Sequence, residues 1–216
     1  TKCTIPDIDT PLSRSYFQPI LPPSKIDGDY PGALVAARSG GSLTRIPMKT
    51  VLLIDGGYLR ASAQKAGKLY DNELIESFAN VCSSPPEYLF RIFYYDAPQF
   101  RGARSMPVSG ELKVFQSSDQ WLTDLSKLER FAVRRGTIGF RGWKPKTVPI
   151  GSGRPLADAD FMTVFEQKGV DMRIGLDIAE FAERGSADRI LMVSGDTDMV
   201  PALKHARRAG LEVGLV

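Results

Sequence analysis

Short, wholly apolar segments separated by amphipathic helical segments are the feature that most constrains the fold of this chain. "TVLLI" at 50–54 and "RILMVS" at 189–194 each contain four consecutive large apolar residues. Such runs are typical of strands in parallel sheets, which are buried on both faces and lose the polar-apolar alternation. A sheet of this kind needs helices on both faces. The pattern therefore predicts an α/β fold with a mainly parallel central sheet.

The remaining segments alternate in the order that such a fold requires. Apolar periodicity and helix-stop signals predict helices at 58–67, 72–82, 118–131, 169–185 and 200–210. Apolar and aromatic runs predict further strands at 87–95, 131–140, 161–167 and 211–216. Residues 1–47 hold seven of the fifteen prolines and no periodic apolar segment, so we expect an extension without its own core. The predicted domain spans 48–216.

The composition excludes several kinds of catalytic site. The chain has two cysteines and one histidine, His205, which we interpret as a surface residue of a basic helix. Ser-His-Asp, Cys-His and histidine-rich zinc chemistry need more than this. Two cysteines are too few for a disulfide framework, which fits a cytoplasmic location. No apolar run approaches the ~18 residues of a membrane span, so no membrane partner is expected.

Carboxylates follow two of the predicted strands directly. Asp55 ends the first apolar run, and Asp196 and Asp198 follow the second. Ligands of open parallel sheets bind beyond the carboxyl ends of the strands, and Asp171 opens the longest predicted helix. Converging carboxylates repel one another unless a cation lies between them, and hard oxygen ligands suit Mg²⁺ or Mn²⁺. The four aspartates are therefore candidate catalytic residues and metal ligands.

Each of these aspartates also has a structural interpretation. Asp198 or Thr197 fits the N-cap of the helix predicted at 200–210. Asp171 is favoured in a first helical turn by the helix dipole, and Asp55, before two glycines, fits a turn. Asp177 lies six residues after Asp171, about 240° around a helix, so it need not face the same site. We keep it as an additional candidate metal ligand.

Residues 130–157 contain seven positively charged side chains, no acidic one and several aromatic ones. A cationic surface with aromatic faces suits single-stranded nucleic acid, because bases stack on rings and phosphates pair with lysine and arginine. We expect Arg141, Trp143 and Lys144 to bind substrate on the same side as the acids. The alternative is a solvated loop whose aromatic side chains belong to the core.

Four segments together resemble a known family. "LLIDGGYLR", "VRRGTIGFRGW", "QKGVDMRIGLDIAEFA" and "ILMVSGDTDMVPALKHARRAGLEVGLV", in this order, are similar to the NYN domain of the PIN-like nuclease superfamily, in its bacterial DUF88 or LabA-like branch. The resemblance covers roughly residues 50–216. It implies a three-layer α/β/α fold and a ribonuclease site in which acidic residues bind a divalent metal.

The resemblance also implies roles for individual residues. The metal-site acids would be Asp55, Asp171, Asp196 and Asp198. Lys168 would lie beside the substrate phosphate, and Ser194 would help to shape the substrate-binding loop. Many members have an asparagine shortly after the first Asp-Gly, where this chain has Gly57-Tyr58. The family's domain also usually continues past the segment matching "LEVGLV", where this sequence stops, so we expect that an edge element of the domain is missing.

The leading interpretation is a metal-dependent endoribonuclease acting on single-stranded RNA, with Mg²⁺ or Mn²⁺ as cofactor. A phosphatase of the haloacid-dehalogenase type would use "DTDMV", but only eighteen residues follow Asp198, too few for its further motifs. The non-enzymatic alternative is a degenerate domain that binds RNA or a partner protein.

A homo-oligomer is compatible with the sequence, and "ALVAA" at 33–37 is the part of the extension expected to cover an open sheet edge.

Overall fold

The computed structural model describes residues 48–83, 88–149 and 153–216. The predicted extension, with its "ALVAA" segment, lies outside these ranges. No helix in the described ranges is long and apolar enough to cross a membrane.

The centre of the molecule is a parallel sheet of five strands in the order β5-β2-β1-β8-β9. Its strands are β1 (Lys49–Asp55), β2 (Tyr88–Asp96), β5 (Phe131–Arg135), β8 (Arg189–Val193) and β9 (Glu212–Leu215). The central strand β1 is fully buried from Val51 to Ile54. Burial on both faces explains the continuous apolar sequence, and the predicted parallel sheet is confirmed.

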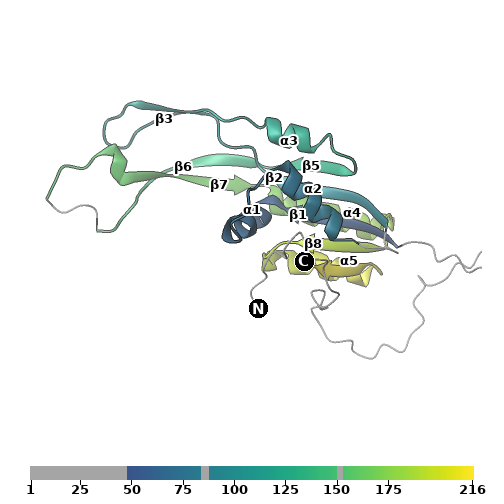
Figure 1. The fold of residues 1–216 in the computed structure, drawn as a ribbon. Coiled ribbons are helices and arrows are strands. Elements are labelled where there is room, and N and C mark those ends of the chain that lie inside the picture. The colour runs from purple at the N-terminus through teal and green to yellow at the C-terminus, as the bar shows by residue number, and fades with distance from the viewer. Residues whose placement is uncertain (1–47, 84–87, 150–152) are drawn as a thin grey trace, which may run out of the picture.

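Helices cover both faces of this sheet. They are α1 (Gly56–Lys65), α2 (Asn72–Val81), α3 (Gln120–Leu125), α4 (Val170–Arg184) and α5 (Val200–Arg208). Figure 1 shows α2 and α5 on opposite sides of the sheet. One apolar core joins the sheet to α4 and α5, and a second joins it to α1, α2 and α3. The predicted three-layer α/β/α fold is confirmed.

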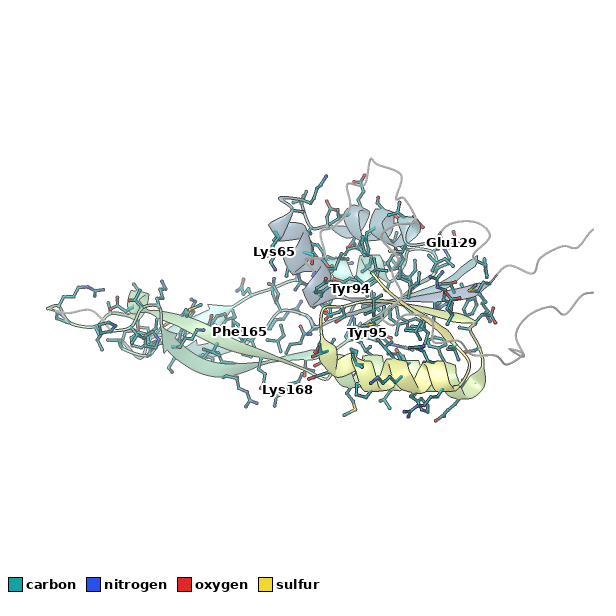
Figure 2. The ribbon with its side chains drawn as sticks, turned by 90° about the horizontal axis from the view of Figure 1, so that it is seen from below. Lys65, Tyr94, Tyr95, Glu129, Phe165 and Lys168 are labelled. Atoms are coloured by element: carbon teal, nitrogen blue, oxygen red, sulfur yellow. The ribbon has the colours of Figure 1, made fainter. Side chains whose placement is uncertain are left out.

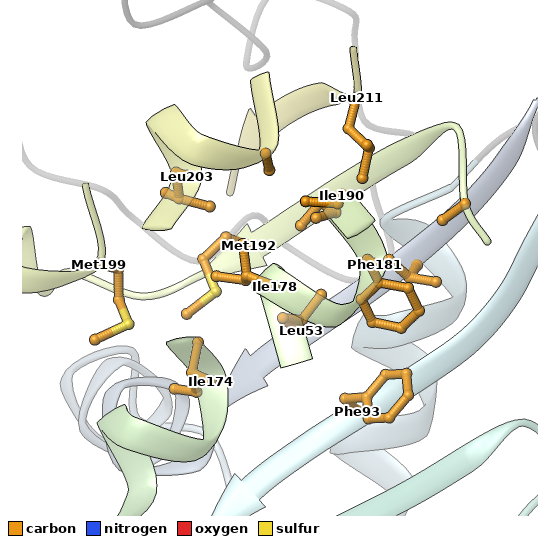
Figure 3. Packing of buried hydrophobic residues seen from close by; sticks show 14 of the residues in the cluster. Leu53, Phe93, Ile174, Ile178, Phe181, Ile190, Met192, Met199, Leu203 and Leu211 are labelled. Atoms are coloured by element: carbon orange, nitrogen blue, oxygen red, sulfur yellow. The ribbon is translucent and has the colours of Figure 1, made fainter. Parts of the chain in front are cut away.

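Successive residues of β1 enter opposite cores, as the pleat of a strand requires. Leu53 packs in the α4–α5 core with Ile174 and Met192 (Figure 3), whereas Leu52 belongs to the other core. Phe181 of α4 closes the first core with an edge-to-face ring contact to β2, at 5.4 Å between ring centroids.

Residues 97–168 differ from the predicted organisation. They contain two antiparallel hairpins outside the central sheet, β3 (Gly102–Ser105) with β4 (Leu112–Phe115), and β6 (Thr137–Pro145) with β7 (Phe161–Lys168). Figure 1 shows both projecting from one end of the sheet, and we call them together the arm. The strand predicted at 131–140 is therefore wrong as a single element, because it divides at Gly136. The helix predicted at 118–131 is also too long, since α3 ends at Leu125.

Gly136 divides the predicted strand because the chain is crowded there. A Cβ atom on this residue would lie 2.8 Å from the carbonyl oxygen of Lys168 and 2.7 Å from Cγ2 of Val170. The hairpin β6–β7 therefore leaves the sheet and returns to it at the same point. Its returning strand β7 ends directly before α4.

Aromatic packing holds the two hairpins of the arm together. The rings of Phe100, Phe115, Phe140, Trp143 and Phe165 contact one another at centroid distances of 5.5–6.4 Å. The indole N–H of Trp143 donates a hydrogen bond of 2.9 Å to the carbonyl oxygen of Ser105 in β3. These contacts give the arm a small core of its own.

Candidate functional site

The four predicted aspartates lie at the carboxyl edge of the central sheet, which we call the acidic edge. Because β1 and β8 are parallel neighbours, Asp55 and the loop carrying Asp196 and Asp198 leave the sheet side by side. Asp171 is the second residue of α4, which packs on the same sheet. Its pKa is raised, first by partial burial and then by the negative charges of the other three aspartates. The four carboxylates therefore share one electrostatic environment.

Asp55 is held by the start of α1. Its Oδ1 accepts hydrogen bonds from the backbone N–H groups of Gly57 (2.9 Å) and Tyr58 (3.2 Å), so Asp55 is the N-cap of this helix. Its Oδ2 accepts a longer bond of 3.4 Å from the hydroxyl of Ser194. Burial raises the pKa of Asp55, although these hydrogen bonds favour the charged form. The structural interpretation of Asp55 as a turn residue is therefore confirmed, because its Oδ1 makes the hydrogen bonds of the turn.

Asp196 is held in a similar way by the loop after β8. Its Oδ1 accepts a hydrogen bond of 2.9 Å from the N–H of Asp198 and caps a short 3₁₀ turn at Thr197–Met199. Ser194 Oγ accepts a bond of 3.1 Å from the N–H of Asp196, so this hydroxyl links the two acidic loops. The predicted capping of the next helix by Asp198 or Thr197 is wrong, because α5 has no side-chain cap.

The carboxylates of the acidic edge are spread apart in this structure. Within the described ranges, no three acidic, histidine or cysteine side chains lie close enough together to hold a metal ion. The expectation that the carboxylates would already be close enough to share one ion is therefore wrong. Asp55 and Asp196 are held by backbone hydrogen bonds, and the like charges repel one another. The chemistry of the set nevertheless fits Mg²⁺ or Mn²⁺, because all its donors are hard carboxylate oxygens.

Asp177 does not belong to this site. Its Oδ2 accepts hydrogen bonds from the hydroxyl of Tyr95 (2.7 Å) and from Nε of Arg134 (3.0 Å), and its Oδ1 accepts one from the same guanidinium. These partners lie on β2 and β5, so the carboxylate joins α4 to the sheet. We correct its assignment from metal ligand to a structural ion pair.

A buried polar network beside the site was missed by the sequence reasoning. Asp96 ends β2, is 1% exposed, and pairs with the guanidinium of Arg60. Its carboxylate also accepts hydrogen bonds from the hydroxyl of Tyr94 (3.1 Å) and the N–H of Ala97 (2.7 Å). A Cβ atom on Gly56 would lie 2.8 Å from Asp96 Oδ2, so the network supports the turn that follows Asp55.

A signal for this network was present in the sequence. Asp96 follows an apolar and aromatic strand directly, just as Asp55 does, and the same strand-end rule applied to both would have found it. Arg60 gives no such signal, because its position on the helix face next to Asp96 depends on the packing of α1.

Tyr58 connects the two acidic loops by packing. A Cβ atom on Gly195 would lie only 2.6 Å from Cε2 of the Tyr58 ring, so this ring rests directly on the loop between Ser194 and Asp196. The position is the one where an asparagine was expected. In this chain the ring of Tyr58 packs between the loop after β1 and the loop after β8.

The predicted basic residues lie on the arm. Arg141 pairs with Glu166, and the ammonium of Lys168 lies 3.6 Å from the same carboxylate. Lys144 is exposed and makes no ion pair within the described ranges. It pairs across the hairpin with Met162, whose side chain lies on the same face of β7 as Glu166 and Lys168. We call this the outer face of β6–β7.

Trp143 lies on the other face of this hairpin, in the aromatic core of the arm. Its indole N–H is bonded to Ser105, so the structure gives Trp143 a packing role, and substrate contact by this side chain stays a prediction. Figure 2 shows Lys168 at the end of β7 nearest the sheet. From there one residue, Gly169, leads into α4 and Asp171. The outer face therefore runs toward the acidic edge.

Comparison with known proteins supports the family suggested by these motifs. No curated protein matches the chain. Among solved structures, a protein of unknown function from Vibrio parahaemolyticus is 15% identical, with 79% of this chain and 82% of that chain covered and a TM-score of 0.40. The NYN domain family matches residues 49–216. This match covers most of the chain and includes all four aspartates of the acidic edge, so the chain belongs to the NYN domain family, which has a nuclease-type fold.

Proposed function

We propose that this protein is a metal-dependent ribonuclease that hydrolyses phosphodiester bonds of single-stranded RNA at the acidic edge of the sheet. The observation that carries the proposal is the gathering of four aspartates from three separate segments. Two of them, Asp171 and Asp198, make no hydrogen bond or ion pair through their carboxylates within the described ranges. Carboxylates gathered in this way repel one another, and a bound cation offsets that cost.

The roles of the residues follow from their contacts. Asp55, Asp171, Asp196 and Asp198 would hold Mg²⁺ or Mn²⁺. Such an ion, when bound, lowers the pKa of a water ligand and stabilises negative charge on the scissile phosphate. Asp55 and Asp196, fixed by backbone N–H groups, keep the two loops in place.

The cationic residues would position the substrate. Lys168 lies three residues before Asp171, so its ammonium can bind a non-bridging phosphate oxygen near the acids. Arg141 and Lys144 continue the positive charge along the outer face of β6–β7. This arrangement needs no protein nucleophile, which agrees with the single histidine and two cysteines of the chain.

Cleavage of a single-stranded RNA of about 12 nucleotides, with Mg²⁺ or Mn²⁺ and with EDTA, tests the proposal. Asp196→Asn should reduce the rate by about 100-fold or more, because the metal contributes several kcal/mol of charge stabilisation. The asparagine oxygen can still accept the hydrogen bond from Asp198 N–H, so the fold should persist. Asp124→Asn, on the surface of α3, is the matched control. Equal cleavage by both variants would contradict the proposal.

The open arrangement of the acids favours a second candidate function. A domain without a preformed metal site can bind RNA or a partner protein and leave it intact. In that case the same RNA would bind equally well with Mg²⁺ and with EDTA, and gel analysis would show no product at any metal concentration. The cleavage assay therefore separates the two functions.

A further inference from the structure

A solvent-open cavity of about 430 Å³ lies at the root of the arm and has no part in the site described above. It is lined by the segment after β2, the end of β4 and the segment after it, the start of β6 and the middle of β7: Gln99, Phe100, Val114, Phe115, Gln116, Ser117, Ile138 and Phe165. Its volume is within the ~300–1,000 Å³ range of small-ligand sites. None of the lining side chains carries a charge, so the lining favours a neutral group over a phosphate or an amino acid.

Three phenylalanine rings form the apolar wall of the cavity. Phe165 lies 5.5 Å from Phe100 and 5.6 Å from Phe115 between ring centroids. Phe165 is 39% exposed, so part of its ring surface is open to a ligand. Aromatic rings with a free face are the usual stacking partners of unpaired nucleobases.

Two carboxamides supply the polar groups. The side chains of Gln99 and Gln116 make no hydrogen bond within the described ranges, and each offers both a donor and an acceptor. The backbone that carries them is fixed, because Ser117 Oγ donates a bond of 3.1 Å to the carbonyl oxygen of Gln99 and Arg101 Nε donates one of 2.6 Å to that of Ser117. Carboxamides of this kind pair with the edges of nucleobases.

The cavity is joined to the acidic edge by three short connections. Gln99 lies three residues after the buried Asp96 at the carboxyl end of β2, and Ile138 lies three residues after the end of β5. Phe165 lies three residues before Lys168 on β7 (Figure 2). A strand of RNA bound at the acidic edge would therefore pass close to this cavity.

We propose that the cavity binds one unstacked nucleobase of the single-stranded RNA substrate and gives the enzyme a base preference. The inference rests on the proposed function for taking RNA as the substrate. The base would stack on the phenylalanine wall, while Gln99 and Gln116 pair with its edge. Phosphates would remain outside the cavity, beside Arg104 and Lys113, whose side chains lie over the rings of Phe100 and Phe115.

Binding of fluorescein-labelled homopolymers of about 12 nucleotides tests this assignment. Titrations of the A, C and U oligomers are done in EDTA, so that cleavage does not interfere. The wild-type protein should prefer one base by about fivefold or more, because the two carboxamides hydrogen-bond the edge of one base better than those of the others. The double variant Gln99→Ala/Gln116→Ala should bind all three within about twofold, with the salt dependence of binding unchanged. Gln167→Ala, an exposed glutamine of β7 outside the cavity, should retain the wild-type preference.

Three outcomes would overturn the proposal. The first is equal binding of all homopolymers by the wild-type protein. The second is a preference that survives in the double variant. The third is competition by a nucleoside monophosphate at the concentration at which the oligomer itself binds, which would identify the ligand as a free nucleotide.

A measurement on the wild-type protein keeps the inference testable if the double variant does not fold. Photocrosslinking with an oligomer containing 4-thiouridine should label the peptides that carry Phe100 or Phe115, as located by mass spectrometry. Crosslinks confined to other peptides would contradict the proposal. A base preference without metal-dependent cleavage would refute the proposed function alone, so the two failures can be told apart.

Discussion

At the scale of single residues, the four aspartates of the acidic edge fall into two pairs. Asp55 and Asp196 are bonded to backbone N–H groups, and they fix the loops that carry them. Asp171 and Asp198 have no such bonds in the described ranges, so their carboxylates can move. A bound cation would draw the second pair toward the first. Metal binding at this edge should therefore stabilise the fold through Asp171 and Asp198 in particular.

Asp171→Asn tests this division. The pKa of Asp171 is raised above the ordinary value of 3.8, which means that ionisation of this carboxyl costs stability at neutral pH. The substitution should increase the free energy of unfolding in EDTA by up to about 1 kcal/mol, a small gain because solvent screens the charges. Addition of Mg²⁺ or Mn²⁺ should stabilise the wild-type protein and not the variant.

Urea unfolding at neutral pH, with and without metal, gives the comparison. Asp124→Asn is the control, because the pKa of Asp124 is lowered by its hydrogen bonds to Lys127 and Gln120, and its loss should not stabilise the protein. A destabilised Asp171→Asn protein in EDTA would show that the carboxylate has a structural role at the start of α4.

The substitution Gly195→Ala tests the packing of Tyr58 on the loop that carries Asp196. A Cβ atom there would lie 2.6 Å from the ring of Tyr58, so Gly195→Ala must displace the ring or the loop. We expect a loss of about 1–3 kcal/mol in the free energy of unfolding and a lower rate of RNA cleavage. Gly175→Ala in α4, where no atom lies within 4 Å of the new Cβ, should instead gain about 0.5–1 kcal/mol. Equal thermal stability of the two variants would contradict the packing role of Tyr58.

At the scale of elements, β7 of the arm is joined to α4, which carries Asp171, through a single residue. β7 ends at Lys168, and Gly169 adopts a left-handed conformation with φ of 78° before α4 begins. Glycine adopts this conformation without steric cost. The direction in which the arm leaves the sheet is therefore set by Gly169 together with the close contact at Gly136.

The hydrogen bond between Trp143 and Ser105 is expected to control how firmly the two hairpins hold together. Trp143→Phe keeps an aromatic ring but removes the N–H donor, which should cost about 1 kcal/mol of local stability. Hydrogen exchange in β3 and β4 should become faster, while exchange in the central sheet stays the same. Trp121→Phe, in the core between α3 and the sheet, should leave exchange in the arm unchanged. Identical exchange of the arm in both variants would assign its stability to ring packing alone.

The elements differ in how far the sequence could predict them. β1 and β8 were predictable because both of their faces are buried, so four consecutive residues in each strand are apolar. The acidic edge followed from the rule that parallel strands end at one side. The strand predicted at 161–167 corresponds to β7, but its pairing with β6 and the hairpin β3–β4 were not predictable, because these strands bury one face against each other and leave the other in solvent. Leu112 and Val114 of β4 are exposed although apolar, so the apolar positions of this strand do not indicate its buried face.

The open state of the acidic site could not be predicted either. Sequence shows which carboxylates reach the edge, but their separation depends on side-chain hydrogen bonds made within each loop. The capping bond of Asp196 to Asp198 N–H and the contact of Tyr58 with Gly195 are examples. Both depend on the local backbone geometry of the loops, which no periodic pattern in the sequence indicates.

At the scale of the whole molecule, RNA binding depends on where the charged side chains lie more than on the net charge. The net charge is only +3, so RNA binding must come from local concentrations of lysine and arginine. The outer face of β6–β7 is one such place. Glu166 lies in the middle of it and pairs with both Arg141 and Lys168, which reduces the positive charge available to phosphates. Lys144 is not compensated in this way.

The salt dependence of RNA binding should therefore distinguish residues that look equivalent in the sequence. Each phosphate contact on a single strand contributes about 0.7 to the slope of log affinity against log salt concentration. Lys144→Gln should lower the slope by about this amount, whereas Arg141→Gln should lower it by less, because Glu166 already offsets that charge. Glu166→Gln should raise affinity by freeing Arg141 and Lys168. Anisotropy titrations in EDTA at several salt concentrations, with Lys65→Gln on α1 as the control, give the slopes. If Lys144→Gln and Lys65→Gln change the slope equally, RNA does not follow the outer face of β6–β7.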